Sequence, residues 1–168
     1  MVAKKYVIGN FKGGVGKSTC AQMLGFESAV NEGKRTLIID LDMQGNTSDV
    51  MNLTHMNFTN EEGGGEGEPI VKEFDTNLYV AGVIPFMLES GDAVDQEMYK
   101  QAQEIYGEHL IKNVVLKNAR LKRYDGSGIT MEKTKKGLLK QWDRKSHELF
   151  ISILKELEEH ENWYAEVE

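Results

Sequence analysis

A glycine-rich segment near the start of the chain carries the residues best suited to chemistry. It reads Lys12-Gly13-Gly14-Val15-Gly16-Lys17-Ser18-Thr19. Glycines let backbone N–H groups crowd around an anion without Cβ clashes, and a helix starting here adds its terminal N–H donors and positive dipole end. Lys17 is placed to reach the β- and γ-phosphates of a nucleotide, and Ser18 to offer a hydroxyl to Mg²⁺. The agreement of the Gly, Lys and Ser/Thr spacing favours phosphate binding over a glycine turn without a ligand.

Two carboxylates form a second candidate site. Asp40 and Asp42 follow a short apolar run over residues 36–39. The carboxyl end of a parallel strand lies on the ligand side of an α/β sheet, and strand alternation points both side chains the same way. Beside a nucleotide, one carboxylate can hold Mg²⁺ through water and the other can orient an attacking water. Without the glycine-rich segment, two solvated carboxylates at a strand end would be an equally good interpretation.

The first half of the chain predicts a βαβ unit that positions both sites. Residues 5–9 have the composition of a buried parallel strand, and residues 18–31 have that of a helix that ends before Gly33. Residues 36–39 then predict a second strand. This order places the glycine-rich segment between a strand and a helix, which is the context that a phosphate-binding loop requires.

The second half predicts further elements of the same class. They are a strand over residues 78–84 stopped by Pro85, a helix over 92–106 stopped by Gly107, a strand over 111–116, a polar loop over 117–137, an amphipathic helix capped by Ser146, and an acidic tail over 158–168. In the final helix, the inward face is expected to hold Leu149, Phe150, Ile153, Leu154 and Leu157.

Composition limits the class of protein. The 168 residues suggest one domain, 1–168, and residues 57–76 hold an acidic, glycine-rich linker. No apolar run approaches the ~18 residues of a membrane span. The N-terminus leads directly into a predicted strand, without a signal peptide, and Cys20 is the only cysteine. These features favour a cytoplasmic location and no membrane partner.

Charge is strongly segregated along the chain. The net charge is −7, but residues 61–111 hold two Lys/Arg and twelve Asp/Glu, whereas residues 112–145 hold eleven and three. The net charge of the whole chain argues against a polyanionic partner. The basic block at 112–145 makes such a partner plausible again.

The front motifs resemble those of the ParA/MinD family of ATPases. A lysine at each end of the glycines resembles the family's deviant Walker A loop, and residues 40–46 resemble its switch I motif D-x-D-P-Q-G-N, with Met43 in place of the proline. The resemblance implies that Lys12 reaches across a dimer to the partner's nucleotide, in the manner of an arginine finger. It also implies that Asp42 serves hydrolysis and that Asp40 supports the magnesium ion.

The resemblance continues into the second half and covers residues 4–56 and roughly 76–160. Residues 117–121 are similar to an Asn-x-Arg-Leu motif, which implies that Asn118 and Arg120 line the adenine. An ordinary polar loop is an equally good interpretation of these two residues. The implied fold is an α/β, P-loop NTPase-like three-layer sandwich with a mostly parallel sheet.

One part of the family pattern is missing. Relatives carry additional central strands, one of which ends in an Asp-x-Pro-Pro-like switch II, the Walker B counterpart. Here the linker 57–76 occupies that place, and residues 70–75, the only candidate, are short, charged and lack the prolines. We therefore expect a sheet reduced in strand number, which either re-pairs or borrows strands from a second chain.

The implied function is a ParA-type ATPase for plasmid or chromosome partitioning. It would use ATP/ADP and Mg²⁺, form a nucleotide-dependent homodimer, bind DNA without sequence preference, and work with a ParB-like DNA-binding partner. The missing switch II leaves open a module that binds nucleotide or dimerises without hydrolysis. An iron–sulfur carrier is disfavoured because Cys20 is alone, and a small-molecule kinase because no phosphoacceptor site or lid is found.

Overall fold

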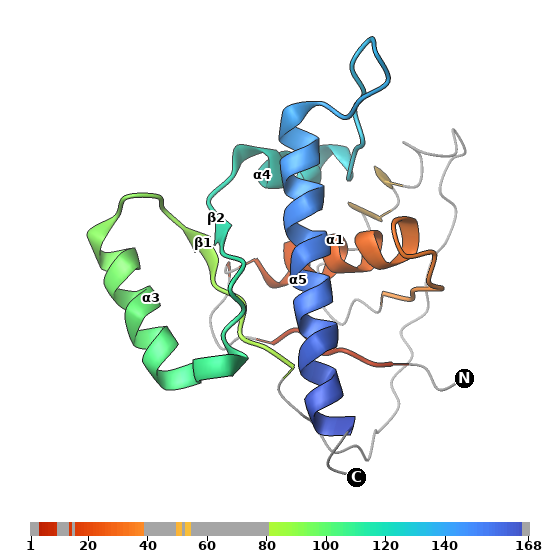
Figure 1. The fold of residues 1–168 in the computed structure, drawn as a ribbon. Helices are drawn as coiled ribbons and strands as arrows, with labels where there is room; N and C mark the ends of the chain where they lie inside the picture. Colours follow the sequence, from red (N-terminus) through yellow and green to blue (C-terminus); the bar gives the residue numbers. More distant parts are fainter. Residues whose placement is uncertain are drawn as a thin grey trace.

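The computed structural model describes residues 4–9, 14, 16–38, 50–51, 53–54 and 81–165, with side chains up to residue 160. The elements of this part, drawn in Figure 1, are α1 (Lys17–Val30), β1 (Phe86–Leu88), α3 (Ala93–Tyr106), the 3-10 turn η1 (Gly107–His109), β2 (Val115–Leu116), α4 (Ala119–Ser127) and α5 (Gln141–Ala165). Lys12, Gly13, Val15, Asp40, Asp42 and the linker 57–76 lie outside the described residues.

Strands β1 and β2 form a parallel sheet and confirm the α/β class. Phe86 pairs with Val115 and Leu88 with Leu116. The N–H of Val115 donates to the carbonyl of Pro85 at 2.9 Å. Helix α3 connects the two strands in sequence, so they form a βαβ unit, and the sheet lies between α3 and α5 (Figure 1). Within the described residues the sheet has two strands, where four were expected.

Two predicted strands of the first half are wrong in their described portions. Residues 5–9 and 36–38 are not in a strand, and Val7 and Leu37 are 81% and 79% exposed. A parallel strand is stable when both faces are covered and its N–H and C=O groups pair with neighbours. Neither segment forms a ladder with β1 or β2, so apolar composition alone was insufficient to predict a strand.

The strands predicted in the second half are shorter and shifted. Between residues 81 and 84 only Val83 pairs, through a single parallel bridge with Leu110. Pro85 does not stop the strand, because β1 begins at the next residue. A proline lacks an N–H but its carbonyl can still accept, so it is compatible with the position just before a ladder.

Residues 119–127 form helix α4, where a polar loop was predicted. Its apolar signal is only two residues, Leu121 and Tyr124, both 1% exposed. The Asn118 side chain caps the helix by accepting from the N–H of Arg120 at 2.8 Å, and Gly128 ends it. A helix of this length has too few turns to show a clear period in sequence.

Helix α5 begins at Gln141, so the prediction that Ser146 caps it is wrong. Ser146 is buried inside the helix, where its hydroxyl donates to the carbonyl of Trp142 at 3.1 Å. The helix also continues to Ala165, through most of the predicted acidic tail. The sequence boundary failed because Asp143, in the first turn, is fully buried and does not behave as a solvent-exposed charge.

The core is formed where α5 packs against α1. Met23 and Phe26 of α1 contribute to one cluster with Phe150 and Ile153 of α5, and all four are at most 4% exposed. These contacts confirm the predicted helix after the glycines and most of the inward face of the last helix. Cys20 lies in the same cluster, and burial raises the pKa of its thiol to about 12.

Candidate functional site

The glycine-rich segment turns directly into α1. Gly14 and Gly16 both have left-handed backbone conformations, with φ of +72° and +83°. L-residues with a Cβ rarely adopt this conformation, so the turn requires glycine at both positions. Helix α1 starts at Lys17, with Ser18 and Thr19 completing the start of its first turn. The predicted order of turn, lysine and hydroxyl is therefore present at the start of a helix.

The start of α1 is suited to an anion. Its N-cap residue, Gly16, makes no side-chain cap hydrogen bond, and the first turn contains no acidic residue. The N-terminus of a helix presents backbone N–H groups and a positive dipole end. The local chemistry therefore fits phosphate groups.

Phe86 of β1 lies directly against this turn. A Cβ built on Gly16 would be 2.1 Å from Cε1 of the Phe86 ring. Gly16 is thus required for space as well as for its backbone angle. The contact seats the turn on the first strand of the sheet. Sequence reasoning missed Phe86, because nothing in its local pattern indicates a partner seventy residues earlier.

A magnesium ion fits only in part with the described residues. Ser18 has an exposed hydroxyl in the first turn of α1 and would supply one oxygen ligand. Magnesium usually takes one or two protein ligands and completes its shell with phosphates and water. No group of three His, Cys, Asp or Glu side chains able to hold a metal occurs among the described residues.

Asn118 and Arg120 have different surroundings. Asn118 lines a cavity of about 300 Å³ that follows β2, together with Leu116, Lys117 and Lys145. Ligands in open α/β sheets bind beyond the carboxyl ends of the strands, so this cavity lies where a ligand is expected. The guanidinium of Arg120 is bound within the protein instead. An adenine contact by either residue stays a prediction.

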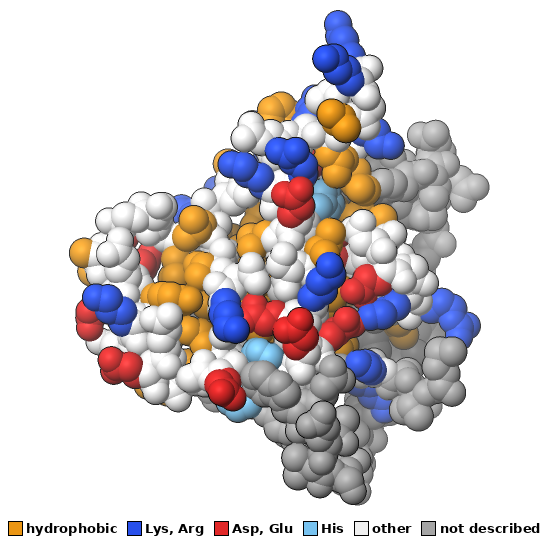
Figure 2. Space-filling model, viewed as in Figure 1, with side chains coloured by type: hydrophobic (Ala, Val, Ile, Leu, Met, Phe, Trp, Pro, Cys, Tyr) orange, Lys and Arg blue, Asp and Glu red, His pale blue; other side chains and the backbone are white. Residues whose placement is uncertain are grey.

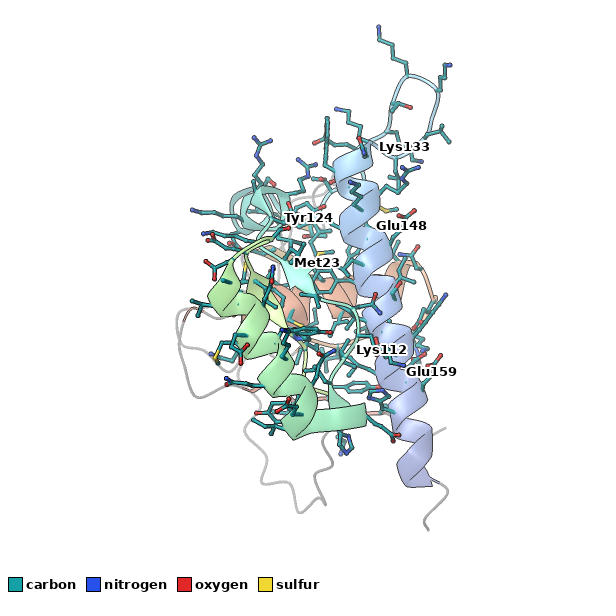
Figure 3. All side chains as sticks on the ribbon, turned by 60° about the vertical axis from the view of Figure 1, so that its left-hand side comes forward. Met23, Lys112, Tyr124, Lys133, Glu148 and Glu159 are labelled. Carbon is teal, nitrogen blue, oxygen red and sulfur yellow. The ribbon has the colours of Figure 1, made fainter. Side chains whose placement is uncertain are left out.

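A buried ion-pair network holds Arg120. Its Nε lies 2.6 Å from Oδ1 of Asp143, and its Nη2 lies 2.7 Å from both Oε1 of Glu132 and Oγ1 of Thr130. The hydroxyl of Tyr124 also donates to Asp143, at 2.8 Å. The Arg120 side chain is 10% exposed and that of Asp143 is fully buried. Figure 3 shows Tyr124 of α4 on the side that faces α5.

The network keeps Asp143 ionised. Burial alone would raise the pKa of this carboxyl. Hydrogen bonds from Arg120, the N–H of Glu132 and Tyr124 outweigh burial and lower the pKa below its ordinary value. Burial and the neighbouring carboxylate raise the pKa of Tyr124, which therefore stays a neutral donor.

A second buried pair connects α1 to α5. The Nδ1 of His147 contacts the carboxylate of Glu27, and its Nε2 lies 2.9 Å from the carbonyl oxygen of Thr130. Both partners are acceptors, so only the doubly protonated imidazolium can donate to both. Burial works to lower the pKa of His147, but the bonds to Glu27 and Thr130 prevail and raise it. No pattern in the sequence indicates this pair, which joins residues 120 positions apart.

The chain belongs to a family of P-loop ATPase domains. A family model described as an AAA domain matches residues 3–160, and the family includes ParA/MinD-like proteins. No match was found among curated proteins or among solved structures. None of the helices that the structure describes is both long enough and apolar enough to cross a membrane.

We expect His147 to make stability depend on pH. Because its folded pKa is raised, the stabilisation is complete below the ordinary value of 6.5 and is lost as pH rises through the folded pKa. A tenfold difference in proton affinity is worth about 1.4 kcal/mol. Urea unfolding between pH 6 and about 9 should show this loss in the wild type and not in His147→Gln. The matched control, His109→Gln on η1, should keep it. Equal pH profiles for the wild type and His147→Gln would contradict the assignment.

Proposed function

We propose that this protein is an ATP-binding partition ATPase of the ParA type. The observation that carries the proposal is the turn at Gly14 and Gly16, which leads without a side-chain cap into a helix starting with Lys17 and Ser18. Family membership supports nucleotide binding by this turn. The partitioning role depends on the sequence motifs alone.

Each predicted residue has a defined task in this proposal. The backbone N–H groups of residues 13–18 bind the phosphates, Lys17 adds a positive charge, and Ser18 holds Mg²⁺ with support from Asp40. The metal neutralises charge on the phosphates when it is bound. Asp42 orients the attacking water, and Lys12 contacts the nucleotide of the partner in a nucleotide-dependent homodimer. Asn118 is proposed to contact the adenine of the nucleotide, since it lines the cavity beyond β2.

Non-specific DNA binding is proposed for the basic block over residues 112–145. Figure 2 shows Lys and Arg side chains gathered over the upper part of the molecule. Lys122 and Arg123 on α4, and Lys135 and Lys136 beyond β2, are exposed. Basic side chains near phosphates release counterions, which is the main source of sequence-independent affinity. A ParB-like protein is the proposed partner.

The alternative is a module that binds nucleotide without hydrolysing it. The missing switch II motif favours this alternative, because the only candidate in the sequence, residues 70–75, is short, charged and lacks the prolines. Phosphate binding needs only the local turn and helix. Hydrolysis also needs a water and a metal held in place from neighbouring strands.

Nucleotide should stabilise the protein through Lys17. At a ligand concentration about 100-fold above Kd, binding adds about 2.7 kcal/mol. Each kcal/mol is worth about 2–4 °C in a domain of this size, so Mg-ATP or Mg-ADP should raise Tm by roughly 5–10 °C. Lys17→Ala should remove most of this shift and leave the Tm of the free protein nearly unchanged. The absence of a shift in a folded wild-type sample would refute nucleotide binding.

Substitutions at Lys12 and Asp42 should distinguish ATP hydrolysis from nucleotide binding. Asp42→Ala removes water positioning but leaves the phosphate contacts, so it should abolish turnover and retain the thermal shift. Lys12→Ala should lose both turnover and the ATP-dependent dimer. Phosphate release and light scattering, with and without DNA, measure the two properties. Background turnover in the wild type, together with a normal thermal shift, would support the non-hydrolysing alternative.

DNA affinity should depend strongly on salt. If about four basic residues contact phosphates, log affinity should fall against log salt with a slope near −3 to −4. Fluorescence anisotropy with a random-sequence duplex, at salt concentrations from about 50 mM upward, gives the slope. Affinity independent of salt, or no binding at the lowest salt, would exclude the DNA proposal.

A further inference from the structure

Helix α3 exposes an apolar stripe. Val94, Met98 and Ile105 are spaced by four and seven residues, so they lie on one side of the helix. They are 69%, 57% and 72% exposed, and the helix has no buried residue. Helices of globular proteins usually bury such a stripe. A partner for this surface is therefore expected.

Carboxylates flank this stripe. By helical spacing, Glu97 and Glu104 lie along one of its edges, and both are exposed. Asp95 lies on the other edge, where its carboxylate accepts from the N–H of Glu89 at 2.6 Å. The only cation of the helix, Lys100, is on the side away from the stripe. The exposed surface of α3 is thus an acidic, amphipathic helix.

A groove with the opposite charge lies elsewhere on the molecule. Apolar side chains between the 130–140 hairpin and α5 line a hollow of about 270 Å³, namely Met131, Leu138, Leu139 and Ile151. Leu138 is 68% exposed. Arg144 and Glu148 also line the hollow, with Nε of Arg144 lying 3.9 Å from Oε1 of Glu148. Lys133, Lys135 and Lys136 are exposed on the hairpin that forms one wall, so cations outnumber carboxylates around the hollow. Figure 2 shows hydrophobic side chains directly below these projecting cations.

The hairpin that forms one wall of this groove is fixed to the protein. The N–H of Thr134 donates to the carbonyl of Leu138, and that of Lys140 to the carbonyl of Glu132, both at 2.7 Å. The N–H of Glu132 donates in turn to buried Asp143 at 2.7 Å. A wall held in this way is already formed before a partner binds, which lowers the entropic cost of binding.

We propose that α3 of one copy docks into the groove between the hairpin and α5 of a second copy. An amphipathic helix in an apolar groove is a common mode of recognition, and here the acidic edge of the helix meets the basic rim of the groove. The two surfaces lie at different ends of the molecule (Figure 1). One chain therefore cannot close the contact on itself.

The proposed contact joins two different surfaces, so it is head-to-tail. A dimer formed in this way keeps one unused helix on one copy and one unused groove on the other, so assembly continues into a ring or an open chain. The contact uses neither the glycine-rich turn nor a nucleotide. It is therefore independent of the nucleotide-dependent dimer proposed above.

The test is sedimentation velocity on the full chain without nucleotide and with EDTA, from micromolar to millimolar protein. The wild type should form species larger than a dimer as concentration rises. Ile105→Asp should block the helix and Leu138→Asp the groove, and each variant alone should be monomeric. An equimolar mixture should stop at the dimer, since it contains one intact helix and one intact groove. Circular dichroism verifies that both variants are folded.

Charge variants test the pairing. The double variant Glu97→Lys/Glu104→Lys reverses the charge of the helix edge and should weaken association by about tenfold or more. The double variant Lys136→Glu/Arg144→Glu reverses charge at the groove and should have a similar effect. Mixing the two double variants should restore it, whereas the control Lys100→Glu should have no effect. A wild type that stays monomeric would overturn the proposal. A closed dimer insensitive to Leu138→Asp would also overturn it, since α3 would then pair with its own copy.

Discussion

The carboxylate of Asp143 is the group on which the second half of the structure depends. It is fully buried at the start of α5 and accepts hydrogen bonds from Arg120, Tyr124 and the N–H of Glu132. These donors come from α4 and from the hairpin, so one buried anion joins three segments. A buried carboxylate is tolerated only when charge and hydrogen bonds compensate for lost hydration. The order of the segments around it is therefore specified by polar contacts, while the apolar core between α1 and α5 supplies most of the burial.

This arrangement separates support from ligand chemistry. The glycine-rich turn takes its geometry from a single contiguous segment and from Phe86 below Gly16. Asn118 both lines the cavity beyond β2 and caps α4. Arg120, next but one in sequence, points into the buried network instead. Asn118 and Arg120, two residues of one predicted motif, thus serve different purposes: the first lines the cavity, and the second joins the buried network.

Sequence reasoning succeeded where the signal is local. The turn with Gly14 and Gly16, the start of α1 and the end of α3 at Gly107 all depend on residues within about one helical turn of each other. Reasoning failed where tertiary context decides. Residues 5–9 have the composition of a buried strand, yet Val7 is 81% exposed. Whether a segment becomes a buried strand depends on the elements packed beside it, and its own composition does not contain that information. The Arg120–Asp143 and Glu27–His147 pairs left no trace in the pattern, since charged residues are ordinarily assigned to the surface. Asp40, Asp42 and Lys12 remain predictions.

The burial of Cys20 has a practical consequence for experiments on this chain. It is the only cysteine, it lies 3% exposed between α1 and the core, and its thiol stays protonated at neutral pH. Thiolates, and not thiols, react with alkylating reagents. A cysteine introduced at the surface can therefore carry a fluorophore or spin label without removal of the native one. Slow alkylation of Cys20 itself would in turn report how often α1 separates from α5, in a protein that needs no added probe.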